Sequence, residues 1–92
     1  MTSPRNKWTA EHIRAARCTA LQPLLKQMEY PMQAMQNGNI RVYDLPKEIL
    51  IKETYWVCPA TGNGGNAIDL LMQVMGMSFS EAMHKLEEFM EP

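Results

Sequence analysis

Residues 55–72 read YWVCPATGNGGNAIDLLM, a stretch whose character changes twice. The tyrosine, tryptophan and valine at its start are typical of a β-strand. A proline and three glycines follow, and glycine permits the positive φ angles of a tight turn. Asn66 then caps a helix, with Asp69 three residues later as a weaker capping-box partner. The stretch therefore predicts a strand, a glycine-rich turn and a helix in direct succession.

The helix after Asn66 is apolar on nearly every side, so we expect it to be the central buried element. Its predicted end is Gly76, because glycine is the usual residue after a helix C-terminus. Ser78 and Glu81 then form a capping box for a last helix. The predicted inner face of that last helix consists of Phe79, Ala82, Met83, Leu86 and Met90.

Three runs of strand-forming residues lie in the middle of the chain, at 40–43, 49–52 and 55–58. Residues 44–47 are interpreted as a turn, and two residues connect the second run to the third. We therefore expect a three-stranded antiparallel meander, which must pack on helices because so small a sheet is marginal alone. Residues 31–36 are interpreted as either a short turn of helix or a loop.

The N-terminal part predicts a tail and two helices. Residues 1–7 are polar and contain a proline, so we expect a flexible tail. Thr9 is a suitable cap for a helix that ends near Cys18. A second helix begins at Thr19 or Ala20, with a proline early in it, where the missing N–H is tolerated.

The length of 92 residues corresponds to one domain. We expect an α+β fold in which residues 1–18 form a tail and an extra helix and residues 19–92 form a single globular unit. No stretch approaches the roughly 18 apolar residues that span a bilayer, and the N-terminus lacks the apolar core of a signal peptide. The two cysteines are expected to be reduced. These features predict a cytoplasmic protein with no membrane partner.

Charge is divided between the two halves of the chain. Residues 1–47 contain seven Lys or Arg against three Asp or Glu, a net charge of +4, whereas residues 48–92 contain two against seven, a net charge of −5. A basic half can face a polyanion although the total charge is only −1. Chance segregation is an equally good interpretation of the same counts.

Residues 55–72, together with Met-Ser-Phe-Ser-Glu-Ala at 77–82, resemble the N-terminal zinc-binding domain of DnaG-type primases, the CHC2 zinc finger. In that family a strand ends in Cys-x-x-Cys-Gly-x-Gly-Gly, Asp-x-Ile begins a helix, and Ser-Phe-x-Glu-Ala begins the next. The chain is also similar to zinc-less versions of the domain in phage, plasmid and other mobile-element proteins. The resemblance covers about residues 40–90 and implies a zinc-ribbon-like primase domain without zinc, whereas residues 1–18 match no part of the family.

The zinc ligands of the family are missing. Family zinc is held by Cys-x-x-His before the sheet and Cys-x-x-Cys at its end. Cys58 falls on the first cysteine of the second pair, but Thr61 stands on the second, and residues 19–57 contain neither cysteine nor histidine. A structural zinc site needs four ligands, so we expect no metal and no cofactor. Packed side chains, including Met72 and Met83, are expected to replace the metal, because methionine fills irregular gaps.

Basic and aromatic residues near the predicted sheet form a candidate binding site. Arg41 and Tyr43 share one face of their strand because side chains alternate along a strand. Tyr55 and Trp56 point to opposite faces for the same reason, so one of them covers the core. Two arginines on the first helix either extend the basic surface or are simply solvated. The candidate residues are Arg14, Arg17, Arg41, Tyr43, Lys47, Lys52, Tyr55 and Trp56.

The sequence contains no nucleophile elbow, no His-Glu-x-x-His and no phosphate-binding Gly-Lys-Ser/Thr pattern, so no enzyme activity and no small-molecule substrate are expected. The leading hypothesis is a non-catalytic module of a mobile element that binds single-stranded DNA or RNA, or a replication complex. The alternative is a small phage-type inhibitor that docks on a host nucleic-acid machine such as a CRISPR surveillance complex. A third and weaker interpretation is a structural subunit or dimerisation module.

Overall fold

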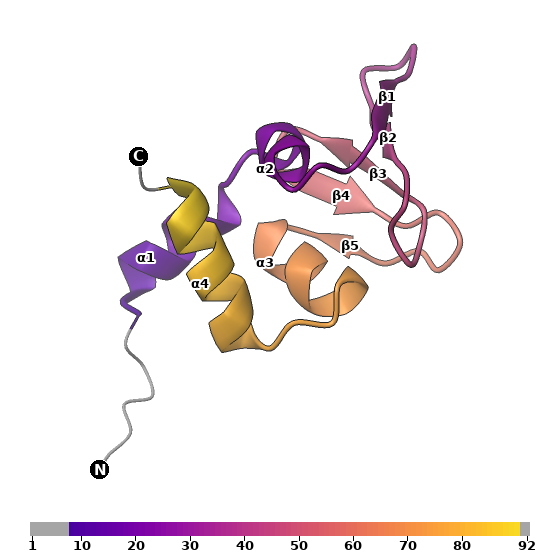
Figure 1. The fold of residues 1–92 in the computed structure, drawn as a ribbon. Helices are drawn as coiled ribbons and strands as arrows, with labels where there is room; N and C mark the ends of the chain where they lie inside the picture. The colour runs from indigo at the N-terminus through magenta and orange to yellow at the C-terminus, as the bar shows by residue number, and fades with distance from the viewer. Residues whose placement is uncertain (1–7, 91–92) are drawn as a thin grey trace.

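The computed structural model describes residues 8–90, which form a small α+β fold (Figure 1). The predicted tail at residues 1–7 lies outside this range. The α-helices are α1 (Ala10–Arg17), α2 (Leu21–Gln27), α3 (Ala67–Asp69) and α4 (Phe79–Met90), and a single π-helical turn, η1 (Leu70–Val74), extends α3. The strands are β1 (Met32–Ala34), β2 (Ile40–Val42), β3 (Ile49–Lys52), β4 (Tyr55–Val57) and β5 (Gly64–Gly65).

The sheet has five strands in the order β1-β2-β3-β4-β5, and every neighbouring pair is antiparallel. The three predicted runs correspond to β2, β3 and β4, so the antiparallel meander is confirmed. The predicted number of three strands is wrong, because β1 and β5 extend the meander at both edges.

Neither additional strand has the composition of a strand. β1 contains no β-branched or aromatic residue, and it is held by pairing with β2 in the register Met32↔Val42. The segment predicted as a helical turn or loop therefore forms one side of a hairpin, whose tip contains Gly38 at a φ of 89°. β5 consists of two glycines, and its pairing with β4 is a tertiary contact that local propensity does not predict.

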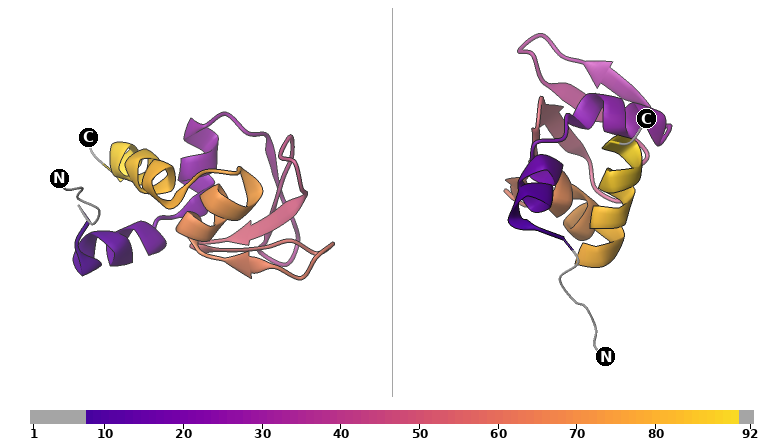
Figure 2. Two further views of the ribbon diagram at one scale, coloured as in Figure 1. Left: turned by 90° about the horizontal axis from the view of Figure 1, so that it is seen from below. Right: turned by 90° about the vertical axis from the view of Figure 1, so that its left-hand side faces the viewer.

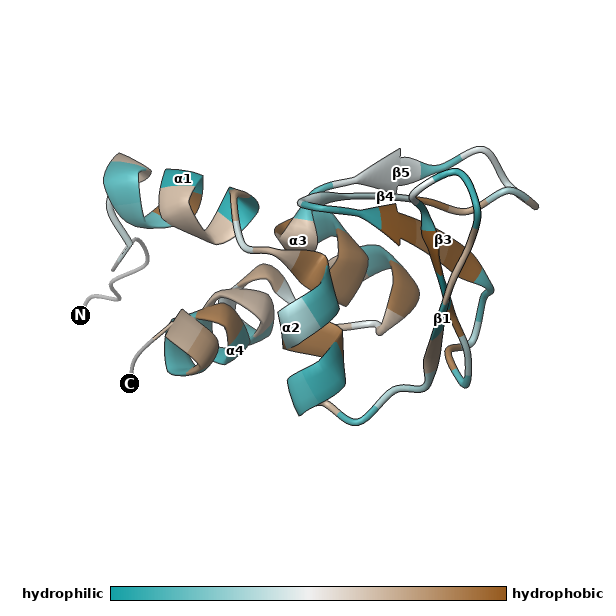
Figure 3. Ribbon diagram, turned by 90° about the horizontal axis from the view of Figure 1, so that it is seen from above, coloured by the Kyte–Doolittle hydropathy of each residue, from teal (hydrophilic) through white to brown (hydrophobic). Residues whose placement is uncertain are grey.

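The helices lie on one side of the sheet, which gives the fold two layers (Figure 2). We call the sheet face toward the helices the inner face and the opposite face the outer face. Apolar residues gather between the layers, as the hydropathy colours show (Figure 3). The largest side chains in this core, each less than 2% exposed, include Trp56, Leu21, Leu24, Leu25, Ile49, Ile51, Leu70 and Leu71.

The two N-terminal helices begin close to their predicted positions. The Thr9 hydroxyl accepts a hydrogen bond from the N–H of His12 at 3.1 Å, which confirms the predicted cap of α1. α1 packs against α3 and α4, and its Ala16 is fully buried in the core. α2 begins at Leu21 after Ala20 and packs on β3, where the N–H of Leu21 donates to the carbonyl of Glu53 at 2.9 Å.

The predicted central helix is buried but is not one continuous α-helix. The N–H of Asn66 donates to Asp69 Oδ2 and the N–H of Asp69 donates to Asn66 Oδ1, both at 3.1 Å, so the predicted capping box is confirmed. After Asp69 the α-helix changes to the π-helical turn η1. Gly76, at a φ of 76°, follows this turn near the predicted end of the helix. The π turn depends on wider i→i+5 hydrogen bonding, such as the bond from the N–H of Met75 to the carbonyl of Leu70.

α4 begins at its predicted cap and follows part of its predicted inner face. The N–H of Ser78 donates to Glu81 Oε1 at 2.9 Å and the N–H of Glu81 donates to Ser78 Oγ at 3.1 Å, so this capping box is also confirmed. Ala82, Met83 and Leu86 are buried as predicted, whereas Phe79 and Met90 are exposed, so their assignment to the inner face is wrong. Among residues 8–90, no helix has the length and apolar character needed to cross a bilayer.

Not all of the methionines pack in the core, where they were expected to take the place of a bound metal. Met83 is 2% exposed and lies in the core, but Met72 is 37% exposed. Met72 lies on the π turn, whose buried side already contains Leu70, Leu71 and Val74. The expectation that Met72 packs in the core is therefore wrong.

Candidate functional site

The outer face of the sheet carries a continuous row of side-chain positions. Residues directly opposite one another on neighbouring strands project to the same face. The pairs Gln33↔Arg41, Arg41↔Leu50, Leu50↔Val57 and Val57↔Gly64 therefore form one row across all five strands. Leu50 and Val57, at the centre of this row, are half-buried although no helix among the described residues covers them.

Two tyrosines stand on opposite sides of that row. Tyr43 follows the buried Val42 and so projects to the outer face beside Arg41. Tyr55 pairs with Lys52 and projects to the same face, two positions before Val57. Tyr55 is 55% exposed and Tyr43 is 37% exposed. Both rings are therefore accessible on the outer face.

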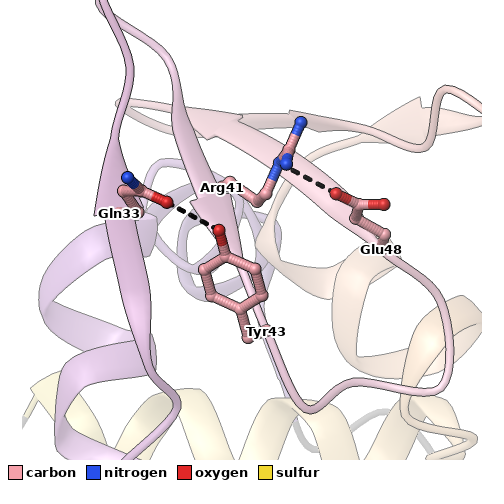
Figure 4. A network of polar contacts seen from close by, with 4 residues as sticks. All are labelled: Gln33, Arg41, Tyr43 and Glu48. Carbon is pink, nitrogen blue, oxygen red and sulfur yellow. Dashed lines mark hydrogen bonds and ion pairs between the residues drawn. The ribbon is translucent and has the colours of Figure 1, made fainter.

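Two polar contacts hold one end of this face in place (Figure 4). The Tyr43 hydroxyl donates a hydrogen bond to Gln33 Oε1 at 2.7 Å. Arg41 Nε lies 2.8 Å from Glu48 Oε2, but its N–H does not point at that oxygen, so the contact is an ion pair without a hydrogen bond. Both side chains are at least 40% exposed, and such pairs contribute only about 0–1 kcal/mol. The pair nevertheless balances the charge of Arg41 on this face.

Gly64 provides space for Tyr55. A Cβ atom built at Gly64 would lie 2.9 Å from the Tyr55 hydroxyl oxygen and 2.6 Å from the carbonyl oxygen of Trp56. The Tyr55 ring therefore lies across the position where β5 has no side chain. Gly64 thus has a role beyond the turn, because it lets the Tyr55 ring approach the backbone of β5.

We expect Gly64→Ala to destabilise the protein by about 1–3 kcal/mol, because the methyl group overlaps backbone oxygen as well as the Tyr55 ring. Gly62→Ala is the control: Gly62 has a φ of 81° but no atom within 4 Å of a built Cβ, so only the backbone cost of about 1 kcal/mol applies. Urea unfolding measures both stabilities, and proton NMR shifts of the Tyr55 ring should change only in Gly64→Ala. A Gly64→Ala protein with wild-type stability would contradict this account.

Trp56 is not part of the outer face, which corrects its assignment as a candidate binding residue. It pairs with Ile51 and Gly65, projects to the inner face and is 1% exposed. Its Nε1–H donates to the carbonyl of Asn66 at 2.9 Å. The physical reason is the alternation of a strand: because Trp56 fills the core, its neighbour Tyr55 faces outward.

The remaining candidate residues are spread over the molecule. Lys52 lies on the outer face beside Tyr55, and Lys47 is exposed in the bend at residues 44–47. Arg14 and Arg17 lie on α1, which packs against α3 and α4 away from the sheet (Figure 1). The structure therefore brings Arg41, Tyr43, Lys52 and Tyr55 together on one face and does not add the two α1 arginines to them.

Cys58 lies at the start of the turn after β4 and is buried. The N–H groups of Thr61 and Gly62 donate to the carbonyl of Cys58, at 3.2 and 2.8 Å. A hydrogen bond from the Thr61 side chain lowers the pKa of the Cys58 thiol, and the backbone N–H groups of Thr61 and Ala60 act in the same direction, whereas burial opposes them. Within residues 8–90, no group of three or more His, Cys, Asp or Glu side chains could hold a metal ion.

Sequence reasoning missed Gln33, Leu50 and Val57 as outer-face residues. The run Ile49-Leu50-Ile51 is apolar throughout, so its alternation does not reveal which side chain faces outward. Gln33 lies in a strand that was not predicted. The signal that could have found Leu50 is its direct pairing with Arg41, which requires the register of the hairpin rather than composition.

No family model matches the chain, and the comparisons with curated proteins and with solved structures find no similar protein.

Proposed function

We propose that the outer face of the sheet binds single-stranded nucleic acid, alone or within a nucleoprotein, as a non-catalytic module. The observation that carries the proposal is the pair of exposed rings, Tyr43 and Tyr55, on either side of a row whose centre is apolar, with Lys52 beside one of them. A sheet face with exposed aromatic rings suits unpaired bases, which stack on such rings, while lysines pair with the phosphates.

The spacing of the rings suits a short strand. Tyr43 and Tyr55 are separated by two strand spacings, about 10 Å, and by four residues along the strand direction, about 13 Å. Bases stacked on both rings would belong to a segment of about three nucleotides, similar to the two or three bases that other sheet-based modules stack. Leu50 and Val57 then provide an apolar surface for the base or sugar that lies between the two tyrosines.

The resemblance to the primase zinc-binding domain points to the same surface, since that domain is understood to meet template DNA on its sheet. In this proposal the chain contributes binding contacts and no catalysis. We accordingly propose that it acts in the cytoplasm as a zinc-free domain of a mobile element.

We expect Tyr55→Ala to weaken the binding of a fluorescently labelled single-stranded oligonucleotide by about 5- to 150-fold, because one stacked base is worth about 1–3 kcal/mol. Lys52→Ala should reduce the slope of log affinity against log salt by about 0.7, the value for one phosphate contact on a single strand. Fluorescence anisotropy at several salt concentrations measures both quantities.

Arg17→Ala is the matched control, because it also removes one positive charge but lies on α1, away from the outer face. Equal losses in Lys52→Ala and Arg17→Ala would indicate binding by general charge and would rule out the outer face as the site. Absence of binding by the wild-type protein at every salt concentration would overturn the proposal.

A protein partner is the second candidate, and the pairing of Arg41 with Glu48 favours it. This ion pair reduces the positive charge of the outer face, and exposed tyrosine and arginine side chains are typical of protein interfaces. The protein would then be a phage-type inhibitor that docks on a host nucleic-acid machine. A stoichiometric host complex that survives nuclease treatment and is lost in Tyr55→Ala would support this candidate over the first.

A further inference from the structure

β1 is one of the two edge strands of the sheet, and only one of its sides is paired. β2 occupies one side. The hydrogen bonds just beyond the ladder run from the N–H of Tyr43 to the carbonyl of Pro31 and from the N–H of Met35 to the carbonyl of Asn39. Hydrogen-bonded and non-hydrogen-bonded pairs alternate in an antiparallel ladder, so Gln33 is hydrogen-bonded to β2. Met32 and Ala34 therefore direct their backbone N–H and C=O groups to the open side.

Of the features that usually protect an edge strand, β1 has one, its short length of three residues, and lacks the others. Natural edges carry charged residues, a proline within the strand, a bulge or a covering segment. Residues 31–40 read PMQAMQNGNI and contain no charge, and the proline precedes the strand. Figure 1 shows the β1–β2 hairpin standing away from the helices. Within residues 8–90, no backbone hydrogen bond from another segment reaches the open side, and Gln33 and Ala34 are exposed.

We propose that two copies of the protein pair through β1, antiparallel and about a two-fold axis at Gln33. In this register Met32 faces Ala34 of the partner subunit, and Ala34 faces Met32 of the partner subunit. Both are residues whose backbone groups point to the open side, so each pair exchanges two N–H···O=C bonds, about four in all. The two five-stranded sheets then join into one continuous sheet.

A second copy suits this edge for two reasons. The strand is uncharged, so it meets itself without repulsion, whereas like charges directly opposite each other would destabilise the pairing. The pairing also sets the large Met32 side chain opposite the small Ala34 on the inner face, with the two Gln33 side chains opposite each other on the outer face. The contact is short, so the dimer is expected to be concentration-dependent.

Sedimentation velocity over about a hundredfold range of protein concentration tests the proposal. The wild-type mass should rise from 10.5 kDa toward twice that value. Gln33→Glu and Gln33→Lys should each weaken dimerisation by at least about tenfold, because they bring like charges together across the axis. An equimolar mixture of the two variants should restore the dimer, because opposite charges then face each other.

Gln33→Glu preserves the contacts of the monomer, whereas Gln33→Lys places a second positive charge opposite Arg41, so circular dichroism and thermal unfolding must show that this variant is folded. The carboxylate introduced by Gln33→Glu can still accept the hydrogen bond that the Tyr43 hydroxyl donates to Gln33 Oε1 in the wild type. Ala34→Pro is an independent test: it removes an N–H group that points away from β2, and proline is tolerated at such an edge position. It should abolish half of the intersubunit bonds while circular dichroism and thermal unfolding stay close to wild type.

Two outcomes would overturn the proposal. In the first, the wild-type protein remains a monomer at every concentration, which is also the result expected if the edge accepts a peptide from another protein. In the second, a wild-type dimer forms but persists unchanged in Gln33→Glu, Gln33→Lys and Ala34→Pro. Neither outcome depends on whether the outer face binds an oligonucleotide, so the two proposals are tested separately.

Discussion

Trp56→Ala is expected to lower the free energy of unfolding by about 3–5 kcal/mol and the melting temperature by about 15–30 °C. Trp56 is one of the largest fully buried side chains and lies between the sheet and the helices. Its removal leaves a cavity, and it also deprives the Asn66 carbonyl of its hydrogen-bond donor. A domain has only about 5–15 kcal/mol of stability in total, so this loss is a large fraction of it.

Trp56→Phe is the matched control for that variant. Phenylalanine keeps much of the buried ring but cannot donate to the Asn66 carbonyl, so a smaller loss of about 1–2 kcal/mol is expected. Far-UV circular dichroism during urea and thermal unfolding measures both variants without depending on tryptophan fluorescence. If Trp56→Ala melted within a few degrees of the wild type, Trp56 could not hold the central position in the core.

Gly65→Ala should have the second-largest effect, a loss of about 2–4 kcal/mol from overpacking and a broken helix cap. A Cβ atom at Gly65 would overlap the Asp69 side chain, with Asp69 Cγ at 2.8 Å and the carboxylate oxygen Oδ2 closer still. That oxygen accepts the hydrogen bond from the N–H of Asn66 that closes the capping box. The variant should therefore disturb the start of α3 as well as β5, which thermal unfolding and NMR shifts of Asn66 report.

A double-mutant cycle with Asp69→Ala gives the sharper test. Asp69→Ala alone removes the capping partner and should destabilise the protein by about 1 kcal/mol. In the presence of Asp69→Ala, Gly65→Ala should cost less, because two of the three close contacts, those with Cγ and Oδ2, are gone. Strictly additive losses would show that Asp69 is not the residue that requires glycine at position 65.

The parts of the fold that sequence predicts are those fixed by local chemistry. Both capping boxes and the cap at Thr9 depend on a side chain that accepts a hydrogen bond from a backbone N–H three residues away. All three form as predicted. The runs at β2, β3 and β4 have strand-forming composition, and short connections force them to be antiparallel neighbours. These features required no knowledge of contacts between distant residues.

The parts that sequence does not predict depend on partners elsewhere in the chain. β1 and β5 have weak strand propensity and exist because β2 and β4 offer them hydrogen bonds. Alternation alone could not decide whether Tyr55 or Trp56 faces the core, because both rings are large and aromatic. The pairing of Arg41 with Glu48 also requires the register between β2 and β3, so the charge balance of the outer face was not visible in the sequence.

The order of the strands has a consequence for how the protein is made. Each strand pairs with the next one along the chain, and the connections are short. The entropy lost in closing each loop is therefore small, and such low contact order is associated with fast folding. When the chain has emerged from the ribosome as far as β4, four of the five strands are already available for pairing. Assembly of the sheet can accordingly proceed during translation, and the late arrival of α3 and α4 completes the core that makes it stable.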